Sequence, residues 1–82
     1  MSEQINELVV SIKSTDAQVQ EMSLKIKGLY DIIQEKFTEA AGIRTKEIDQ
    51  FYKDIDSTFN AKSKLEANVV NMKKQILNIL LG

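Results

Sequence analysis

The sequence predicts an all-α protein: an antiparallel helical hairpin of two long helices that packs with partners as a four-helix bundle or a larger assembly. Three observations support this prediction. The 82 residues contain no proline and only three glycines, so few residues break a helix. Apolar residues recur at alternating steps of three and four along both halves. One clear stop signal, near Gly42, separates the halves.

The first helix is expected over residues 3 to about 41. Its apolar residues follow one seam, in which Thr15 takes the place of one apolar residue. Such a seam is typical of helices that pack lengthwise. Gly28 lowers helix propensity by ~1 kcal/mol relative to Ala and marks either a close helix crossing or a tolerated surface position. The seam residues are Ile5, Leu8, Ile12, Val19, Met22, Ile26, Leu29 and Ile33. The residues expected to widen this apolar face are Val9, Leu24, Tyr30, Ile32 and Phe37.

A short turn is expected at about residues 42–45. Gly42 suits the left-handed conformation in which many helices end, and Ile43 could then fold back onto Phe37. Thr45 can cap the next helix, with Glu47 near its positive end. Gly42 and Ile43 are therefore the predicted turn residues, and the two halves form one hairpin domain spanning residues 1–82.

The second helix is expected over about residues 46–81. Its alternation of three and four is unbroken, although Thr58 and Lys62 are polar. Polar seam residues can fix register or oligomeric state at a cost in stability. Alternatively, Phe59 and Ala61 indicate that the apolar face shifts locally. The sequence leaves both accounts open. The seam residues are Ile48, Phe51, Ile55, Thr58, Lys62, Leu65, Val69, Met72, Ile76 and Ile79.

Charge supports antiparallel pairing. Residues 1–21 have a charge balance of −3, residues 57–82 have a balance of +3, and a hairpin lays these segments side by side. Exposed ion pairs contribute little individually, so we expect a preference for register and little stability. The net charge of −1, without a basic stripe, argues against nucleic-acid binding.

We expect no enzyme, and no catalytic, cofactor-binding or metal-binding residue. The chain has no histidine or cysteine, which excludes the commonest nucleophile–base pairs. Metal sites of helical bundles pair carboxylates with histidine, which is also lacking. Glu3 with Glu7, and Glu35 with Glu39, have helical spacing but are interpreted as parts of a solvated face.

The second helix has more apolar residues than one neighbouring helix can cover. Val70, Leu77, Leu80 and Leu81 fall outside its seam, so we expect binding to partner helices of a second copy or of another protein. Tyr30, Phe37 and Tyr52, like Phe51 and Phe59, are either interface anchors or core. The residues predicted to bind the partner are Phe51, Phe59, Val69, Val70, Met72, Ile76, Leu77, Ile79, Leu80 and Leu81.

A membrane-bound C-terminal helix is a weaker alternative. Lys73 and Lys74 lie among apolar residues, as in helices that lie on a bilayer surface. The same apolar residues, however, continue a seam that begins at Ile48. The run from Ile76 to Leu81 is far shorter than the ~20 residues of a membrane span. The N-terminal residues lack the layout of a cleaved signal peptide, so export would follow a leaderless route.

A hairpin of this length that turns on a glycine resembles the WXG (Trp-x-Gly) family of small secreted helical proteins and the related partners of LXG toxins. The resemblance covers the whole chain, and its specific motif is Ala40-Ala41-Gly42, with Ala40 at the tryptophan position. It implies a partner or targeting protein that binds a helical toxin domain for type VII secretion. It also implies a bacterial cytoplasmic location before leaderless export.

Two other functions remain open. Phe59-Asn60-Ala61-Lys62-Ser63 and Asn71-Met72-Lys73-Lys74, followed by Ile79-Leu80, look like the C-terminal half of type III secretion needle subunits. That resemblance implies a subunit that polymerises into a filament. A generic coiled-coil adaptor or secretion chaperone, which holds one partner helix, would show the same seams.

Overall fold

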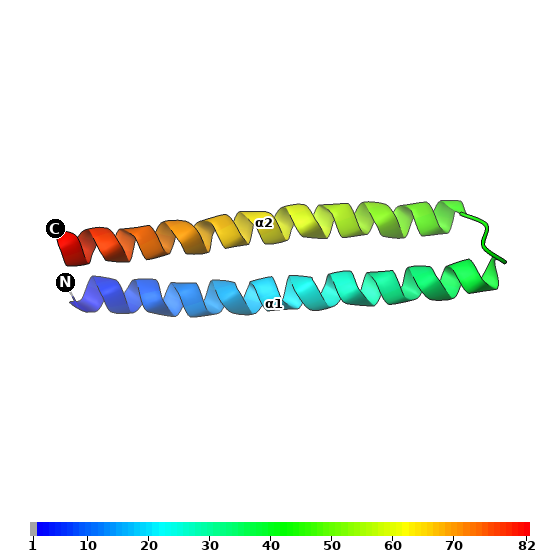
Figure 1. Ribbon diagram of the computed structural model, residues 1–82. Coiled ribbons are helices and arrows are strands. Elements are labelled where there is room, and N and C mark those ends of the chain that lie inside the picture. Colours follow the sequence, from blue (N-terminus) through cyan, green and yellow to red (C-terminus); the bar gives the residue numbers. More distant parts are fainter. Residues whose placement is uncertain (1) are drawn as a thin grey trace.

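The computed structural model describes residues 2–82, which form two antiparallel helices joined by a short turn (Figure 1). Helix α1 spans Ser2–Glu39 and helix α2 spans Lys46–Leu81. The hairpin is long and thin, with dimensions of 61 × 14 × 12 Å. Its two ends differ, because the turn lies at one end and both termini lie at the other (Figure 1). The predicted all-α hairpin is therefore confirmed.

The predicted seams form the contact between the two helices. All the seam residues, including Thr15, are buried or half-buried. Alternating steps of three and four keep side chains on one stripe of a helix, and two such stripes pack along their length. This explains why a chain with so few helix breakers folds back at its middle, since each helix has one apolar stripe to cover.

The best-packed part of the seam lies in the half of the hairpin near the turn. Ile48, the first seam residue of α2, is fully buried. Aromatic side chains from both helices add bulk at this end, so water is excluded more completely here than elsewhere. The core cluster consists of Ile26, Ile33, Ile48 and Ile55, with Leu29, Phe37, Phe51 and Tyr52 packed against it.

Helix α1 ends at Glu39, two residues before the predicted end. The N–H of Gly42 donates to the carbonyl of Phe37 (2.8 Å), and the N–H of Ala41 donates to that of Thr38 (3.2 Å). This pair of bonds is a Schellman motif. In this motif the left-handed residue comes just before the residue whose N–H bonds five residues back. That residue is Ala41, with φ of 53°, and Gly42 follows with φ of 80°. Gly42 is left-handed as predicted, but the first left-handed residue is Ala41, one position earlier.

The expected contact between Ile43 and Phe37 does not cover Ile43, whose side chain is 66% exposed. The reason lies in the motif. The apolar contact of a Schellman ending comes from the residue whose N–H bonds five residues back. Here that residue is Gly42, which has no side chain. Ile43 comes one residue later, where its N–H closes a tight turn on the carbonyl of Ala40 (3.1 Å).

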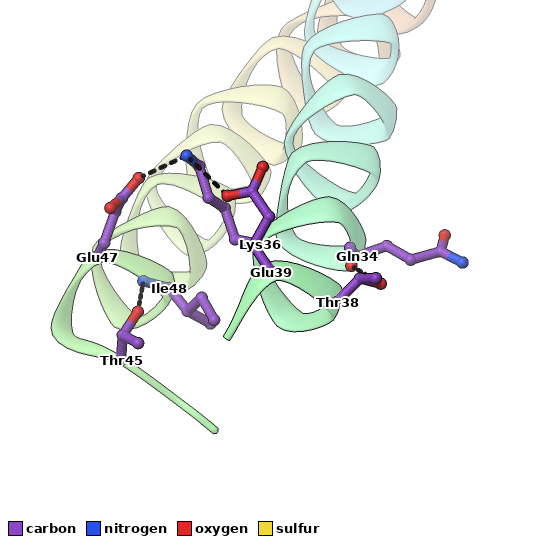
Figure 2. Close-up of polar contacts among 7 residues, drawn as sticks. All are labelled: Gln34, Lys36, Thr38, Glu39, Thr45, Glu47 and Ile48. Atoms are coloured by element: carbon purple, nitrogen blue, oxygen red, sulfur yellow. Dashed lines mark hydrogen bonds and ion pairs between the residues drawn. The ribbon is translucent and has the colours of Figure 1, made fainter. Parts of the chain in front are cut away.

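Helix α2 begins with the predicted cap. The hydroxyl of Thr45 accepts a hydrogen bond from the N–H of Ile48 (3.2 Å) (Figure 2). Lys36 of α1 lies between Glu39 (3.5 Å) and Glu47 (3.3 Å), so it links the end of one helix to the start of the next (Figure 2). The hydrogen bond to Glu47, followed by the charge of Glu39, raises the pKa of Lys36 above its usual value. These contacts hold the two helices in register at the turn.

The acidic and basic terminal segments lie side by side, but within residues 2–82 no ion pair joins them across the hairpin. All the ion pairs of the described residues lie near the turn. Besides the two pairs of Lys36, they include the pair of Arg44 with Asp49. The expected contribution of charge to pairing in the terminal half is therefore not made by direct contacts. The heptad pattern gives the reason, since many of these charges lie on the outer sides of the helices, away from the seam.

The polar seam residues Thr58 and Lys62 remain in the seam. Thr58 is buried and donates its hydroxyl to the carbonyl of Asp54 (2.7 Å). Lys62 is half-buried, with its ammonium group 5.9 Å from the ring centre of Phe59. Phe59 and Ala61 are exposed. The apolar face therefore does not shift here, and the first of the two accounts, polar residues within a continuous seam, describes the hairpin.

We predict that Ala41→Gly stabilises the hairpin by about 0.5–1 kcal/mol, because glycine adopts positive φ without the steric cost that alanine pays. Urea unfolding followed by circular dichroism measures the change. Ala61→Gly, at an exposed position inside α2, is the control and should destabilise by about 1 kcal/mol. A loss of stability in Ala41→Gly would contradict the turn geometry.

We also predict that Thr58→Val stabilises the hairpin by about 0.5–1 kcal/mol. The valine keeps the shape of the side chain and replaces a buried hydroxyl with a methyl group, while the Asp54 carbonyl keeps its helical bond. Thr38→Val is the matched control, because Thr38 donates the same type of bond, to the carbonyl of Gln34 (3.1 Å), from an exposed site. Equal thermal shifts in both variants would contradict the burial of Thr58.

Candidate partner-binding surface

The terminal half of the hairpin covers its own seam incompletely. In this half the described seam residues are those up to Met22 in α1 and those from Lys62 onward in α2. Val69 is buried, and the others are half-buried. Two helices alone provide no further layer over this stripe. The half-buried apolar residues here are Ile5, Leu8, Ile12, Val19, Met22, Leu65, Met72, Ile76 and Ile79.

The apolar residues predicted to be surplus on α2 are exposed. Val70 is 51% exposed, Leu77 55%, Leu80 65% and Leu81 85%. They lie in the same terminal half as the loosely covered seam. Exposed apolar side chains are ordinary when scattered, but a group beside a half-covered seam is typical of an interaction surface.

One broad side of the hairpin is apolar, and we call it the apolar broad face. It is formed by the residues that follow every second seam position, and in an antiparallel pair these positions of both helices flank the same side of the seam. Of its members, Val9 is 36%, Phe59 42% and Tyr30 49% exposed. The apolar residues of this face are Val9, Tyr30, Phe37, Tyr52, Phe59 and Leu80, with Val70 and Leu77 beside it on α2, and its other positions include Asp16, Ser23, Glu66 and Lys73.

The opposite broad side is polar. Lys25, Asp54 and Ala61 line one shallow hollow there, so these side chains of α1 and α2 flank the same side of the seam. The ion pair between Lys36 and Glu47 joins the helices on this side too. The contrast between the two sides makes the hairpin amphipathic across its width, in addition to the apolar seam inside it.

The apolar broad face is covered at its turn end and open toward the termini. The guanidinium of Arg44 lies 4.6 Å from the ring centre of Tyr52, and Arg44 is held there by Asp49. That hydrogen bond to Asp49 also raises the pKa of Arg44. Toward the termini, Phe59 has Lys62 over its ring, and beyond it Leu80 is two-thirds exposed. A partner therefore has most room in the terminal half.

The ten residues predicted to bind a partner fall into two sets. Five lie in the seam between α1 and α2, where one is buried and four are half-buried: Phe51, Val69, Met72, Ile76 and Ile79. Five are exposed: Phe59, Val70, Leu77, Leu80 and Leu81. A partner that stays outside an intact hairpin touches the second set first. Of the predicted turn residues, Gly42 makes the helix-ending bond and Ile43 is exposed in the turn.

One residue expected to widen the seam face lies elsewhere: Leu24 is 69% exposed on the side of α1 that faces away from α2. Ile32 flanks the seam as expected, but on the polar side. Sequence reasoning also missed Val10, which is 66% exposed on the same outer side as Leu24. The seven-residue steps from Val10 to Ala17 and Leu24 were a signal for this outer stripe, because they repeat the period of the seam.

The described residues bring together no group of three or more acidic side chains that could hold a metal ion. Glu3, Glu7 and Glu35 are exposed, and Glu39 is paired with Lys36. No helix in residues 2–82 is both long enough and apolar enough to cross a membrane. The described features that stand out are thus the open seam and the apolar broad face.

Comparison of the chain with protein-family models, curated proteins and solved structures finds no match. The candidate surface is therefore defined by this chain alone: a seam that loosens toward the termini, an apolar broad face, and exposed leucines near the end of α2.

Proposed function

We propose that this chain is a non-catalytic protein-interaction module that binds partner helices along the terminal half of the hairpin. The observation that supports this most strongly is the exposure of Val70, Leu77, Leu80 and Leu81 beside a seam that is only half-covered. A partner helix packed over this region would bury both the exposed side chains and the half-covered seam. Burial of apolar surface is the main favourable term in such association.

The proposed mode of binding is helix against helix. A partner helix would lie along the apolar broad face. Phe59 and Leu80 would then pack between the apolar side chains of the partner helix. Aromatic residues often anchor such interfaces, and Phe59 is the aromatic side chain nearest the open half. Two partner helices, from one hairpin or from a longer chain, would complete a four-helix bundle.

Within this class, we propose a WXG-like partner of a helical toxin or substrate domain in type VII secretion. The length of the two helices, the glycine at the turn and the exposed leucines of α2 support this assignment. The chain would bind its cargo in the bacterial cytoplasm and leave with it. In this role the apolar broad face recognises the cargo and needs no catalytic residue or cofactor.

A needle subunit of type III secretion is the second candidate. The exposure of Leu80 and Leu81 favours it, because both follow the stretch that resembles the needle C-terminal half. Negative-stain microscopy separates the candidates: a needle subunit forms long filaments, whereas a secretion partner forms dimers or a complex of fixed stoichiometry with a larger toxin. A generic coiled-coil adaptor would hold one partner helix and share only the apolar face.

The decisive variant is Leu77→Asp combined with Leu80→Asp. At about 0.3 M salt, where exposed charges are largely screened, we expect the parent to associate and the double variant to be monomeric with its helicity largely retained. Light scattering coupled to gel filtration measures the mass. The matched control is Asn68→Asp with Gln75→Glu, which adds the same charge on the polar broad side and should associate like the parent. Equal monomeric masses for all three proteins would disprove the proposal.

A further inference from the structure

The outer sides of the two helices, which face away from the seam, have opposite charge. Along the outer side of α1 five acidic residues lie beside two lysines, Lys13 and Lys27, and we call this the acidic outer face. Along the outer side of α2 three lysines lie beside Asp49 and Asp56, and we call this the basic outer face. The five acidic residues and the three lysines are exposed. The acidic outer face contains Glu3, Glu7, Glu21, Asp31 and Glu35; the basic outer face contains Lys53, Lys64 and Lys74.

Neither outer face is used within the hairpin. The ion pairs among the described residues involve none of these eight side chains. Gly28, on the outer side of α1, has no atom within 4 Å of where a Cβ would lie, so packing inside the hairpin does not require a glycine there. A glycine inside a helix costs about 1 kcal/mol relative to alanine, and the missing side chain leaves room here for a second helix to approach closely.

The charges of the two faces also match in register. The ion pair of Lys36 with Glu47 joins residues whose numbers add to 83, and we take this sum to mark level positions in the hairpin. Three pairs of opposite charges on the outer faces have residue numbers with nearly the same sum. The sum is 84 for Asp31 with Lys53, 85 for Glu21 with Lys64, and 81 for Glu7 with Lys74. These departures amount to about 3 Å or less along a helix that rises 1.5 Å per residue.

We propose that a second copy of this chain docks its basic outer face on the acidic outer face of the first, pointing in the same direction and without axial shift. In that arrangement the three charge pairs lie level. Ala17 lies opposite Ala67 and Gly28 opposite Ser57, so the helices can approach closely. A shallow hollow lined by Glu3, Asn6, Glu7, Val10 and Ser11 lies where Lys74 of the second copy would reach.

The contact uses different surfaces on its two partners, so it leaves a free acidic face at one end and a free basic face at the other. Such a contact continues into an open row of hairpins unless it closes into a ring. Because both termini lie at the same end of each hairpin (Figure 1), the row would gather all the C-terminal leucines along one edge. The apolar broad face stays free, so the docking does not depend on the proposed function.

The charge test uses two variants that each reverse one face: Glu21→Lys with Asp31→Lys, and Lys53→Glu with Lys64→Glu. Sedimentation velocity follows the mass between about 20 mM and 0.5 M salt. The parent should grow in mass at low salt, each variant alone should lose this growth, and an equal mixture should regain it, because the reversed faces are then complementary. Masses at high salt, which report on the apolar surface, should not change.

The matched control is Asp16→Lys with Glu66→Lys, which changes net charge as much as the first variant but alters exposed residues on the side of the apolar broad face, away from both outer faces. It should keep the growth at low salt. If the parent shows no such growth, if the face-reversed variants keep it, or if the control also loses it, the outer-face contact is wrong.

Cross-linking tests the register, since the chain has no cysteine of its own. Ala17→Cys mixed with Ala67→Cys should form a disulfide between copies under mild oxidation at low salt, several-fold more than either variant alone. Ala17→Cys mixed with Asn78→Cys is the control, because Asn78 lies about 16 Å along the helix from Ala67. Cross-linking of the control pair that equals that of the first pair would overturn the unshifted arrangement.

Discussion

The packing of one seam against one seam constrains everything else in this hairpin. Two helices can bury only the stripe that each turns toward the other, so apolar residues at any other heptad position stay in water. The stripe is well covered near the turn, where Ile48 and Ile55 are buried among aromatic side chains. It is half-covered toward the termini, where Leu77, Leu80 and Leu81 are also exposed. The fold is thus complete at one end and open at the other.

The turn shows how a local ending determines the register of this seam. A Schellman motif ends α1, Thr45 caps α2, and Lys36 links the two helix ends through Glu39 and Glu47 (Figure 2). These contacts lie next to the buried Ile48, so register is determined where packing is best. Farther from the turn no described ion pair joins the helices, and the terminal half relies on half-buried apolar contacts.

Periodicity predicted the hairpin because a seam of this length has few other structural solutions. Both seams were identified residue by residue, and Thr45 was recognised as a cap from its position alone. The left-handed conformation of Gly42 follows from its residue type, whereas that of Ala41 does not, because alanine rarely adopts positive φ. Leu24 was assigned to the wrong side because its apolar character was weighed above its heptad position. The identity of a partner follows from none of these patterns, because an apolar helix face fits many helices.

The central claim is that this chain has more apolar helical surface than a solitary hairpin can bury. The most direct measurement is the midpoint of thermal unfolding over a hundredfold range of protein concentration, at about 0.3 M salt to screen exposed charges. A protein that is stabilised by association unfolds at a temperature that rises with concentration. We predict such a rise for this chain. A midpoint that stays constant over the whole range would show that the lone hairpin is sufficient, and would contradict the claim.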